Sequence, residues 1–398
     1  MTRQEFIKKS IALGLSIPFL SSFLEPHEQT GKNTAKVLII GAGAAGLAAG
    51  YALKKRGLNV QILEASASFG GRVKRADQFG DFPIDLGAEW IHTHPSVLSD
   101  ILSDPSQQPE QEAMEYNPQN IQFLKRGKLR SRNFIRYLYS EWKFKNTSWY
   151  GFLEQYLHPE IADQILYERP VASIDYSGER VSVQTANKEE FQADKVLITV
   201  PVKILQERSI TFEPALPAEK TAAIDSVFVG DGLKIFVAFK ERFYPDLIGF
   251  GGVLKALRME DKYIYDAAFN KGSEQNILGL FAINDKAAEY TRLGSEAAIM
   301  DKYLAELDAM FDGQASQHYI KHVIQNWSSE PYVQGAYSYD FYANRKKTIK
   351  TLRQSVANKL FFAGEALSIK HQATVHGACQ SGLAAAKKLN FSIKQEKA

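Results

Sequence analysis

The sequence predicts an α/β fold, in which a Rossmann-like dinucleotide-binding domain carries an inserted domain of mixed sheet and helices. Three observations predict this fold. Residues 36–64 follow the order strand, glycine turn, helix, strand and acid, which is typical of the first unit of a dinucleotide-binding sheet. Short apolar strands return at 195–200 and 360–363. A length of 398 residues suits two domains, or one large domain with insertions.

The first strand and the turn after it predict the nucleotide site. The apolar run 37–40 is typical of a buried parallel strand, and a glycine-rich turn follows it directly. In such a turn the first glycine permits the bend, the second lets the backbone approach a pyrophosphate, and the third lets the helix pack closely. The candidate cofactor contacts are Gly41, Gly43, Ala45 and Gly46. A glycine-rich βα corner that binds no ligand is the alternative interpretation.

The second strand, 60–63, ends at an acidic residue, Glu64. Its distance along the chain from the first glycine is close to the roughly 20 residues expected for a carboxylate that binds a ribose hydroxyl. The next turn contains Gly71 and Arg72, which supply flexible backbone and a fixed cation. A pyrophosphate would use both.

The bulk composition excludes several classes of protein. The net charge of +3 is too small to indicate a nucleic-acid partner. The single cysteine, Cys379, cannot form an intrachain disulfide or a zinc cluster. The eight histidines show no metal-binding spacing. We therefore expect no nucleic acid and no metal.

The first residues, 1–34, are typical of an export signal followed by a linker. A basic start precedes the apolar stretch 11–24, which is shorter than the about 20 residues of a membrane span. The start resembles a twin-arginine signal with Gln4 in place of the second arginine. We expect export to the periplasm and no integral membrane span. A short amphipathic helix on a cytoplasmic protein is the alternative.

The chain as a whole resembles the flavin-containing amine oxidases, which include monoamine oxidases, polyamine oxidases and flavin histone demethylases. Their pattern GAGxAGLxAA…LEA…GGR…DxGAxW/FxH is matched in order up to His92. Later segments also resemble family motifs, and together the matches span 35 to about 390; these segments are 170–174, 193–201, 326–338, 360–365 and 373–382.

This resemblance implies FAD as the cofactor. The further candidate cofactor contacts are Gly71, Arg72, Gly87, Ala88, Glu89, Trp90, Val171, Trp327, Gly364, Glu365, Thr374 and Val375. Some family members attach the flavin through a cysteine at the position of Ala336, so we expect non-covalent FAD here. The FAD-binding domain would be assembled from 35–95, 165–205 and 355–390. The substrate domain would comprise 96–164 and 206–354.

Local patterns agree with this organisation. Alternating apolar residues at 171–174 and 181–183 predict a hairpin, and 375–388 reads as a helix whose N-terminus would face the flavin. In the first inserted segment, prolines make 105–118 loop-like, and aromatic residues crowd 133–150. Such aromatic residues are more often core than pocket wall.

Lys234 is the candidate catalytic residue. It lies in an apolar strand, 232–239, whose two faces are both hydrophobic. A buried lysine is costly unless it is paired, and such groups cluster at functional sites. The resemblance implies a lysine that contacts flavin N5 through water and assists the reaction with O2. The alternative is a lysine that extends from the strand end into solvent.

The substrate contacts are less complete than in monoamine oxidases, which frame the amine between two tyrosines. Tyr337 matches one tyrosine, and Thr374 occupies the second place. We expect an FAD-dependent oxidase that converts the C–N bond of a small-molecule amine to an imine, with O2 reduced to H2O2. A flavin desaturase or isomerase acting on C–C bonds of an apolar substrate remains an alternative, as does a non-catalytic flavin-binding interaction protein.

Overall fold

The computed structural model describes residues 33–103, 109–131, 141–250, 261–339 and 344–396. The export-signal-like stretch 1–32 lies outside the described residues. The first strand, β1 (Asn33–Ile40), includes the last two residues of the expected linker, 33 and 34. None of the helices in these ranges is long and apolar enough to cross a membrane.

A parallel sheet gathers strands from distant parts of the chain. Its order is β10-β2-β1-β14-β23. Strand β1 pairs in parallel with β14, and β14 pairs in parallel with β23. This confirms the apolar strands expected near residues 37, 60, 195 and 360. The other strands are β2 (Leu58–Leu63), β10 (Ile165–Leu166), β14 (Lys195–Ile198) and β23 (Leu360–Phe362).

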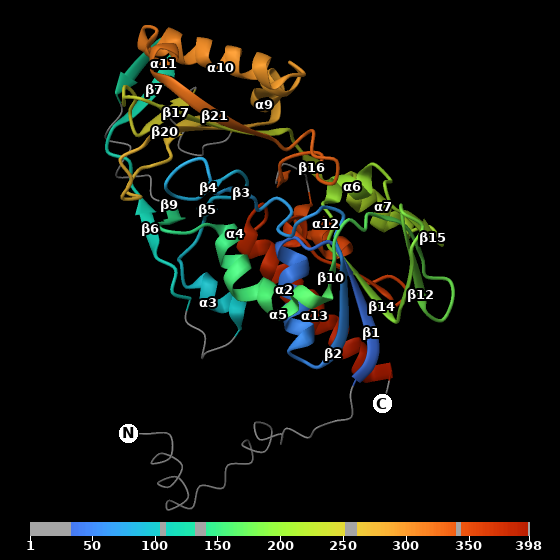
Figure 1. The fold of residues 1–398 in the computed structure, drawn as a ribbon. Coiled ribbons are helices and arrows are strands. Elements are labelled where there is room, and N and C mark those ends of the chain that lie inside the picture. The colour runs from blue at the N-terminus through green and yellow to red at the C-terminus, as the bar shows by residue number, and fades with distance from the viewer. Residues whose placement is uncertain (1–32, 104–108, 132–140, 251–260, 340–343, 397–398) are drawn as a thin grey trace, which may run out of the picture. The chain divides into compact units, whose positions relative to one another are not determined.

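Two helices pack side by side over this sheet, α2 (Ala44–Lys54) and α13 (Val375–Glu396) (Figure 1). The contact is close because Gly382 has no side chain: a Cβ there would lie 2.1 Å from the carbonyl oxygen of Ala45. Short helices from the first inserted segment join the same hydrophobic core; they are α3 (Val97–Leu102), α4 (Trp149–Phe152), the π-helical turn Leu153–Leu157 and α5 (His158–Ile161).

The predicted hairpin is confirmed as two antiparallel strands, which belong to a four-stranded sheet of order β13-β12-β11-β15. This sheet shares a core with the opposite face of the parallel sheet. Its strands are β11 (Val171–Asp175), β12 (Val181–Thr185), β13 (Glu190–Ala193) and β15 (Thr211–Glu213). The helices near it are α6 (Val202–Gln206), α7 (Ala218–Asp225) and α12 (Arg345–Leu352).

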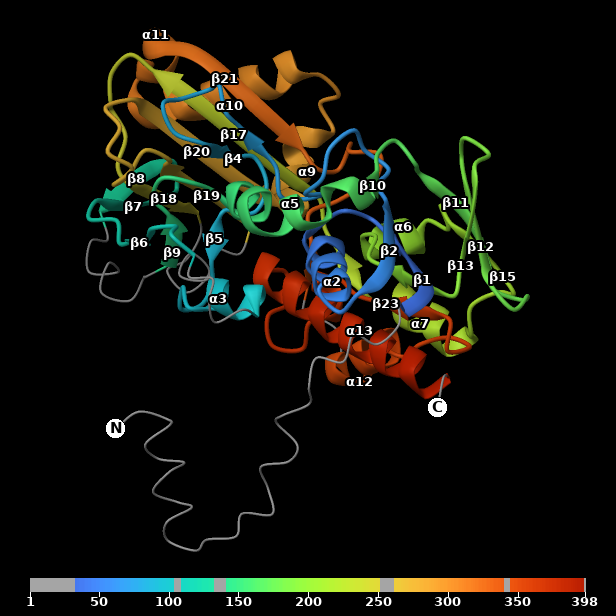
Figure 2. The ribbon, with the colours of Figure 1, turned by 60° about the horizontal axis from the view of Figure 1, so that its bottom comes forward.

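A seven-stranded sheet has the order β21-β17-β20-β19-β18-β7-β8. Its strands are β7 (Ile121–Lys125), β8 (Lys128–Ser131), β17 (Gly232–Phe239), β18 (Leu247–Phe250), β19 (Lys262–Asp266), β20 (Asn276–Ile283) and β21 (Tyr319–Asn326). Helix α10 (Glu296–Phe311) lies along one face (Figure 2), with α9 (Asn284–Thr291) and α11 (Gln314–His318).

Strand β17 is buried on both faces, as its sequence predicts. Leu233, Ile235 and Val237 pack toward α10. Phe236 packs into a different cluster on the other face. All eight residues of the strand are buried, so Lys234 lies in an apolar setting.

Three short sheets complete the described fold. In the sheet β5-β9-β6, the register places Lys143 opposite Trp90. The strands of these sheets are β3 (Arg75–Ala76), β4 (Ile84–Asp85), β5 (Trp90–Ile91), β6 (Ala113–Tyr116), β9 (Glu141–Phe144), β16 (Phe228–Val229) and β22 (Ser338–Tyr339). Strand β6 corrects part of the loop expected at 105–118. The division of 35–390 into cofactor and substrate domains stays a prediction.

Candidate cofactor site and active site

The glycine turn between β1 and α2 has the conformation that a phosphate cradle needs. Gly41 has a φ of +104°, which only glycine adopts readily. A Cβ on Gly46 would lie 1.9 Å from the Gly41 carbonyl oxygen, so this glycine allows the helix to pack against the turn. At Gly43 the nearest atom to a Cβ would be 3.9 Å away, which leaves room for a ligand. The amides that begin α2 can therefore approach a pyrophosphate.

Glu64 lies at the end of β2, beside this turn. Its carboxylate accepts hydrogen bonds from the amides of Ala42 (2.6 Å) and Ser66 (2.9 Å). Burial raises the pKa of Glu64, and these hydrogen bonds oppose that rise. A carboxylate has about four acceptor positions, so a ribose hydroxyl can still donate to it.

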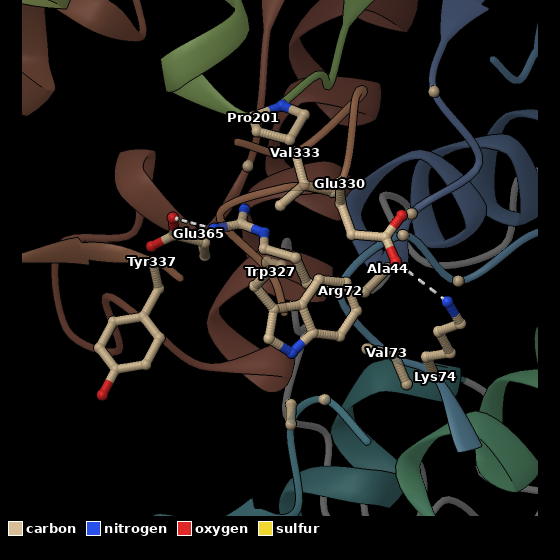
Figure 3. Close-up of a pocket in the computed structure, with 18 of the residues that line it drawn as sticks. Ala44, Arg72, Val73, Lys74, Pro201, Trp327, Glu330, Val333, Tyr337 and Glu365 are labelled. Atoms are coloured by element: carbon tan, nitrogen blue, oxygen red, sulfur yellow. Dashed lines mark hydrogen bonds and ion pairs between the residues drawn. The ribbon is translucent and has the colours of Figure 1, made fainter. Parts of the chain in front are cut away.

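Arg72 and Glu365 bring the two ends of the cofactor site together. The guanidinium of Arg72 lies 3.0 Å from the Glu365 carboxylate and donates to the carbonyl of Ala336. Figure 3 shows Arg72 directed toward Glu365. Glu365 also accepts from the hydroxyl of Ser338 (2.6 Å) and the amide of Ala373 (3.0 Å). The carboxylate therefore connects three segments of the chain.

These groups border one cavity of about 990 Å³. The position of Gly364 fits a ligand approaching the backbone, since its φ is +151° and a Cβ would meet no atom within 4 Å. Every candidate site residue except Gly46 lines this cavity: Gly41, Gly43, Ala45, Glu64, Gly71, Arg72, Gly87, Ala88, Glu89, Trp90, Val171, Lys234, Trp327, Tyr337, Gly364, Glu365, Thr374 and Val375. An elongated dinucleotide such as FAD therefore fits the residues present.

Thr374 contributes to the site as the cap of α13. Its hydroxyl accepts from the amide of Gly377 (3.0 Å) and donates to the carbonyl of His371 (2.8 Å). This is the geometry of an N-cap, which fixes where the helix begins. Val375 follows and lines the cavity, so the positive end of the helix dipole borders the site.

Lys234 is buried and paired. Its ammonium donates to the carboxylate of Glu89 (2.7 Å) and to the carbonyl of Asp85 (2.7 Å). Its side chain is only 3% exposed, so the alternative of a lysine extending into solvent is wrong. The carboxylate of Glu89 points at this lysine, and Lys143 forms an ion pair with its other oxygen. The hydroxyl of Tyr265 also donates to Glu89.

The buried charges around Lys234 shift two carboxyl groups in opposite directions. Burial opposes the ionisation of Glu89, but Lys143 and Lys234 outweigh it and hold the pKa of Glu89 well below its usual range. Burial, and then the charge of Glu89, raise the pKa of Asp85 to about 7. No described residue hydrogen-bonds the Oδ1 atom of Asp85.

Aromatic side chains form part of the wall of the same cavity. Tyr337 stacks on Tyr339 with ring centroids 5.3 Å apart, and burial raises the pKa of Tyr337 to about 12. Tyr263 stacks on Phe281, and its hydroxyl accepts from the indole of Trp90 (2.8 Å). Trp327 lies near Arg72 (Figure 3). This wall suits an apolar carbon chain carrying an amine.

The sequence patterns did not reveal Lys143, Tyr265 or the pair His92–Glu141. The ring Nδ1 of His92 lies 3.2 Å from the Glu141 carboxylate, and both residues line the cavity. Lys143 and Glu141 fall at alternate positions of β9, within the stretch 133–150 interpreted as aromatic core. Only the pairing of β9 with β5 places them beside the site.

Known proteins are similar to this chain in both sequence and fold. A Rossmann-like NAD(P)-binding domain model matches residues 39–104. Lysine-specific histone demethylase 1 homolog 2 of Oryza sativa subsp. japonica is 27% identical over 95% of this chain, which spans 60% of that protein's length. Polyamine oxidase 3 of the same plant is 26% identical over 91% of this chain and 90% of its own length.

Solved structures with the same fold include wild-type putrescine oxidase bound to putrescine, with a TM-score of 0.72 at 16% identity. It covers 90% of this chain and 99% of its own. Cyclohexylamine oxidase from Brevibacterium oxydans IH-35A has a TM-score of 0.73 at 16% identity, covering 92% and 100%. The sequence relatives, a histone demethylase homolog and a polyamine oxidase, do not favour the desaturase or the interaction protein. The model of the flavin containing amine oxidoreductases matches residues 150–390, more than half of the chain, so the chain belongs to this family and is an FAD-dependent amine oxidoreductase.

Proposed function

We propose that this protein oxidises the carbon beside the nitrogen of an amine and passes the electrons to O2. The amine loses a hydride and a proton to become an imine, which water then cleaves to a carbonyl compound and an amine. O2 takes up the two electrons and two protons as H2O2. FAD supplies the hydride-accepting chemistry when bound. The observation that carries the proposal is Lys234 in the wall of the cavity that fits this cofactor.

We propose that the candidate cofactor residues hold FAD without a covalent bond. The amides after Gly43 and the guanidinium of Arg72 would bind the pyrophosphate, and Glu64 would bind a ribose hydroxyl. Val171 would lie on the adenine side. Ala336 offers no thiol, and Cys379 is fully buried against the carbonyl of Ala44 and is not among the residues that line the cavity. The segments 35–95, 165–205 and 355–390 would form the cofactor domain, and 96–164 with 206–354 the substrate domain.

Lys234 would act in the step in which O2 accepts electrons. Its ammonium is a fixed positive charge in a buried setting, where charge interactions are stronger than in water. Negative charge develops on O2 as it accepts electrons, and a preorganised cation stabilises that charge. Tyr337 would orient the amine through its ring, which lines the cavity and stacks on Tyr339.

The substrate class is a small amine that carries a second positive group. Glu141, beside His92, is a carboxylate at the cavity that can receive an ammonium. Glu89 and Glu365 are already paired with basic side chains. The names of the similar proteins, polyamine oxidase and putrescine oxidase, support a diamine or polyamine.

We also propose that the protein is exported to the periplasm and oxidises its substrate there. The basic and apolar pattern of residues 1–32 supports it. Fractionation of cells that make the full chain, compared with a variant carrying Arg3→Gln, tests this point. Accumulation of both proteins in the cytoplasm would contradict export.

Anaerobic mixing of the FAD-loaded protein with a panel of amines tests the proposed activity. Mono-, di- and polyamines, amino acids and methylated lysines are compared by the loss of the oxidised flavin absorbance. We expect rapid bleaching by diamines or polyamines and release of H2O2 when air is admitted. Bleaching by none of these compounds would contradict the proposal.

A further inference from the structure

Glu89 lies between two buried lysines that come from different sheets. One carboxylate oxygen accepts from Lys234 on β17 at 2.7 Å, and the other forms an ion pair with Lys143 on β9. The side chains of Glu89, Lys143 and Lys234 are 6%, 1% and 3% exposed. The hydroxyl of Tyr265 donates to the same carboxylate. The Lys143–Glu89–Lys234 cluster therefore shares one anion between two cations.

Lys143 has no direct route to the substrate or the cofactor. It is absent from the residues that line the cavity, whereas Glu89 and Lys234 are among them. Its ammonium lies 4.7 Å from the ring centroid of Trp90, 5.1 Å from that of Tyr116 and 5.0 Å from that of Tyr265. These rings hold a cation in place without cancelling its charge. Lys143 contacts the cavity-lining residues Glu89 and Trp90, so its effect on the cavity is indirect.

The charge balance explains why a second buried lysine matters. A buried ion pair of Glu89 and Lys234 alone would have no net charge, and the field of the lysine at the cavity would be largely cancelled. Adding Lys143 leaves the three-residue cluster with a net positive charge. Burying an additional cation is costly, and simple packing would be served as well by an apolar side chain.

We propose that Glu89 and Lys143 are positioning residues for Lys234: Glu89 fixes the lysine ammonium at the cavity wall, and Lys143 offsets the charge of Glu89 so that the wall stays positive. This inference rests on the proposed role of Lys234 in the reaction with O2. It adds two residues whose proposed action is on Lys234 rather than on O2 or the amine.

Other ionisable groups also face this cluster and enter its pH dependence. Burial raises the pKa of Asp85 to about 7, and burial followed by the charge of Lys143 lowers the pKa of Lys271 to about 8. Both groups therefore change charge near neutral pH, which is why complete pH profiles are needed. The groups around the cluster are Asp85, Asp266, Lys271, Tyr116, Tyr263 and Tyr265.

Four variants of the full chain test the inference: Glu89→Gln, Lys143→Met, the double variant, and Lys143→Arg as the conservative change. Lys262→Met is the matched control, because Lys262 is also a buried lysine paired with a glutamate, Glu306, but does not line the cavity. Circular dichroism and thermal melting establish which variants fold. Glu89→Asp replaces Glu89→Gln if the latter does not fold. The shorter carboxylate weakens the pair with Lys234, so both readouts described below should shift in the direction expected for Glu89→Gln, by a smaller amount.

The first readout uses protein without FAD. The rate of reductive methylation of Lys234 is followed by peptide mass spectrometry against pH. We expect Glu89→Gln to lower the pH midpoint of this modification by about one unit or more, because it removes the counter-charge. Lys143→Met should raise the midpoint, and the double variant should recover part of the Glu89→Gln shift. Lys143→Arg and Lys262→Met should match the wild type.

The second readout is the rate at which O2 reoxidises the FAD-loaded protein after chemical reduction, with no amine present. We expect Lys143→Met to slow this step about tenfold, as befits the loss of one preorganised charge. Unchanged midpoints and unchanged reoxidation profiles in folded Glu89→Gln and Lys143→Met would overturn the inference. A different result would overturn the proposed role of Lys234 instead. In that case the midpoints shift as expected in Glu89→Gln and Lys143→Met, but O2 reoxidises a Lys234→Met protein at the wild-type rate.

Discussion

The guanidinium of Arg72 lies 3.0 Å from the carboxylate of Glu365, so an ion pair joins the early glycine turn to the strand–helix connection near the end of the chain. The Glu365 side chain is 8% exposed and that of Arg72 is 24% exposed. A partly buried pair of this kind fixes the distance between the two halves of the cofactor site. Loss of either partner would leave the other charge uncompensated.

Glu365→Gln should weaken FAD binding by about tenfold or more, because Arg72 loses its anchor while the shape of the side chain is kept. FAD affinity is measured by fluorescence titration of the apoprotein. Arg208→Gln breaks an exposed pair with Asp225 and is expected to leave FAD affinity unchanged. Equal affinity in Glu365→Gln and wild type would show that the pair does not organise the site.

Gly382→Ala should destabilise the protein by about 1–3 kcal/mol, because the new methyl group would overlap the backbone of α2 at Ala45. The midpoint of thermal unfolding of the apoprotein measures this effect. Gly178→Ala is the control, since the nearest atom to a Cβ there would be 3.6 Å away. A melting temperature of Gly382→Ala equal to that of the control would contradict the close α2–α13 contact.

Asp85 should make the stability of the folded protein depend on pH. Burial raises its pKa to about 7 in the folded state, so the folded protein binds more protons than the unfolded chain between about pH 4 and about pH 7. Its contribution to the free energy of unfolding therefore falls as pH rises through this window. Asp85→Asn should remove this loss and raise the melting temperature at pH 8 more than at pH 5.

The Asp85 side chain can be replaced without removing the carbonyl that accepts from Lys234, so the substitution isolates the carboxyl group. The measurement is a melting curve of wild type and variant at each pH. A constant difference between the two proteins across the whole range would contradict the raised pKa.

Tyr337→Phe should retain nearly the wild-type kcat/KM, because phenylalanine keeps the ring to which we assign the role, and the raised pKa keeps the lost hydroxyl uncharged at neutral pH. Tyr337→Ala removes the ring that stacks on Tyr339 and should lower kcat/KM for the best amine about tenfold or more. Steady-state assays of H2O2 release compare the two variants. A large loss in Tyr337→Phe would assign the hydroxyl a chemical role.

Much of the cofactor site could be predicted from sequence because its signals are local. The turn at 41–46 and the strand that holds Lys234 carry their constraints in consecutive residues, and the structure confirms both. Side chains alternate between the two faces of β17, and both faces are apolar, which was sufficient to identify Lys234 as the exception. The family resemblance supplied the distant motifs, and their residues line one cavity.

Lys143, the second lysine partner of Glu89, could not be predicted in this way. Lys143 reaches it only through the pairing of β9 with β5, a contact between distant segments that leaves no periodic signal. Strand β6 also escaped prediction, because proline spacing dominated the pattern around it. Helices α3, α4 and α5 are too short for helical periodicity to predict that they pack in the core with α2.

Lys234 is the residue on which the proposed chemistry depends, and its ammonium is held by Glu89 at the cavity wall. Stopped-flow measurement of O2 reoxidation in Lys234→Met is the most direct test, with FAD affinity measured on the same protein. We expect reoxidation to slow by about tenfold or more while FAD affinity changes much less. Reoxidation at the wild-type rate in a folded, FAD-loaded Lys234→Met protein would contradict the account.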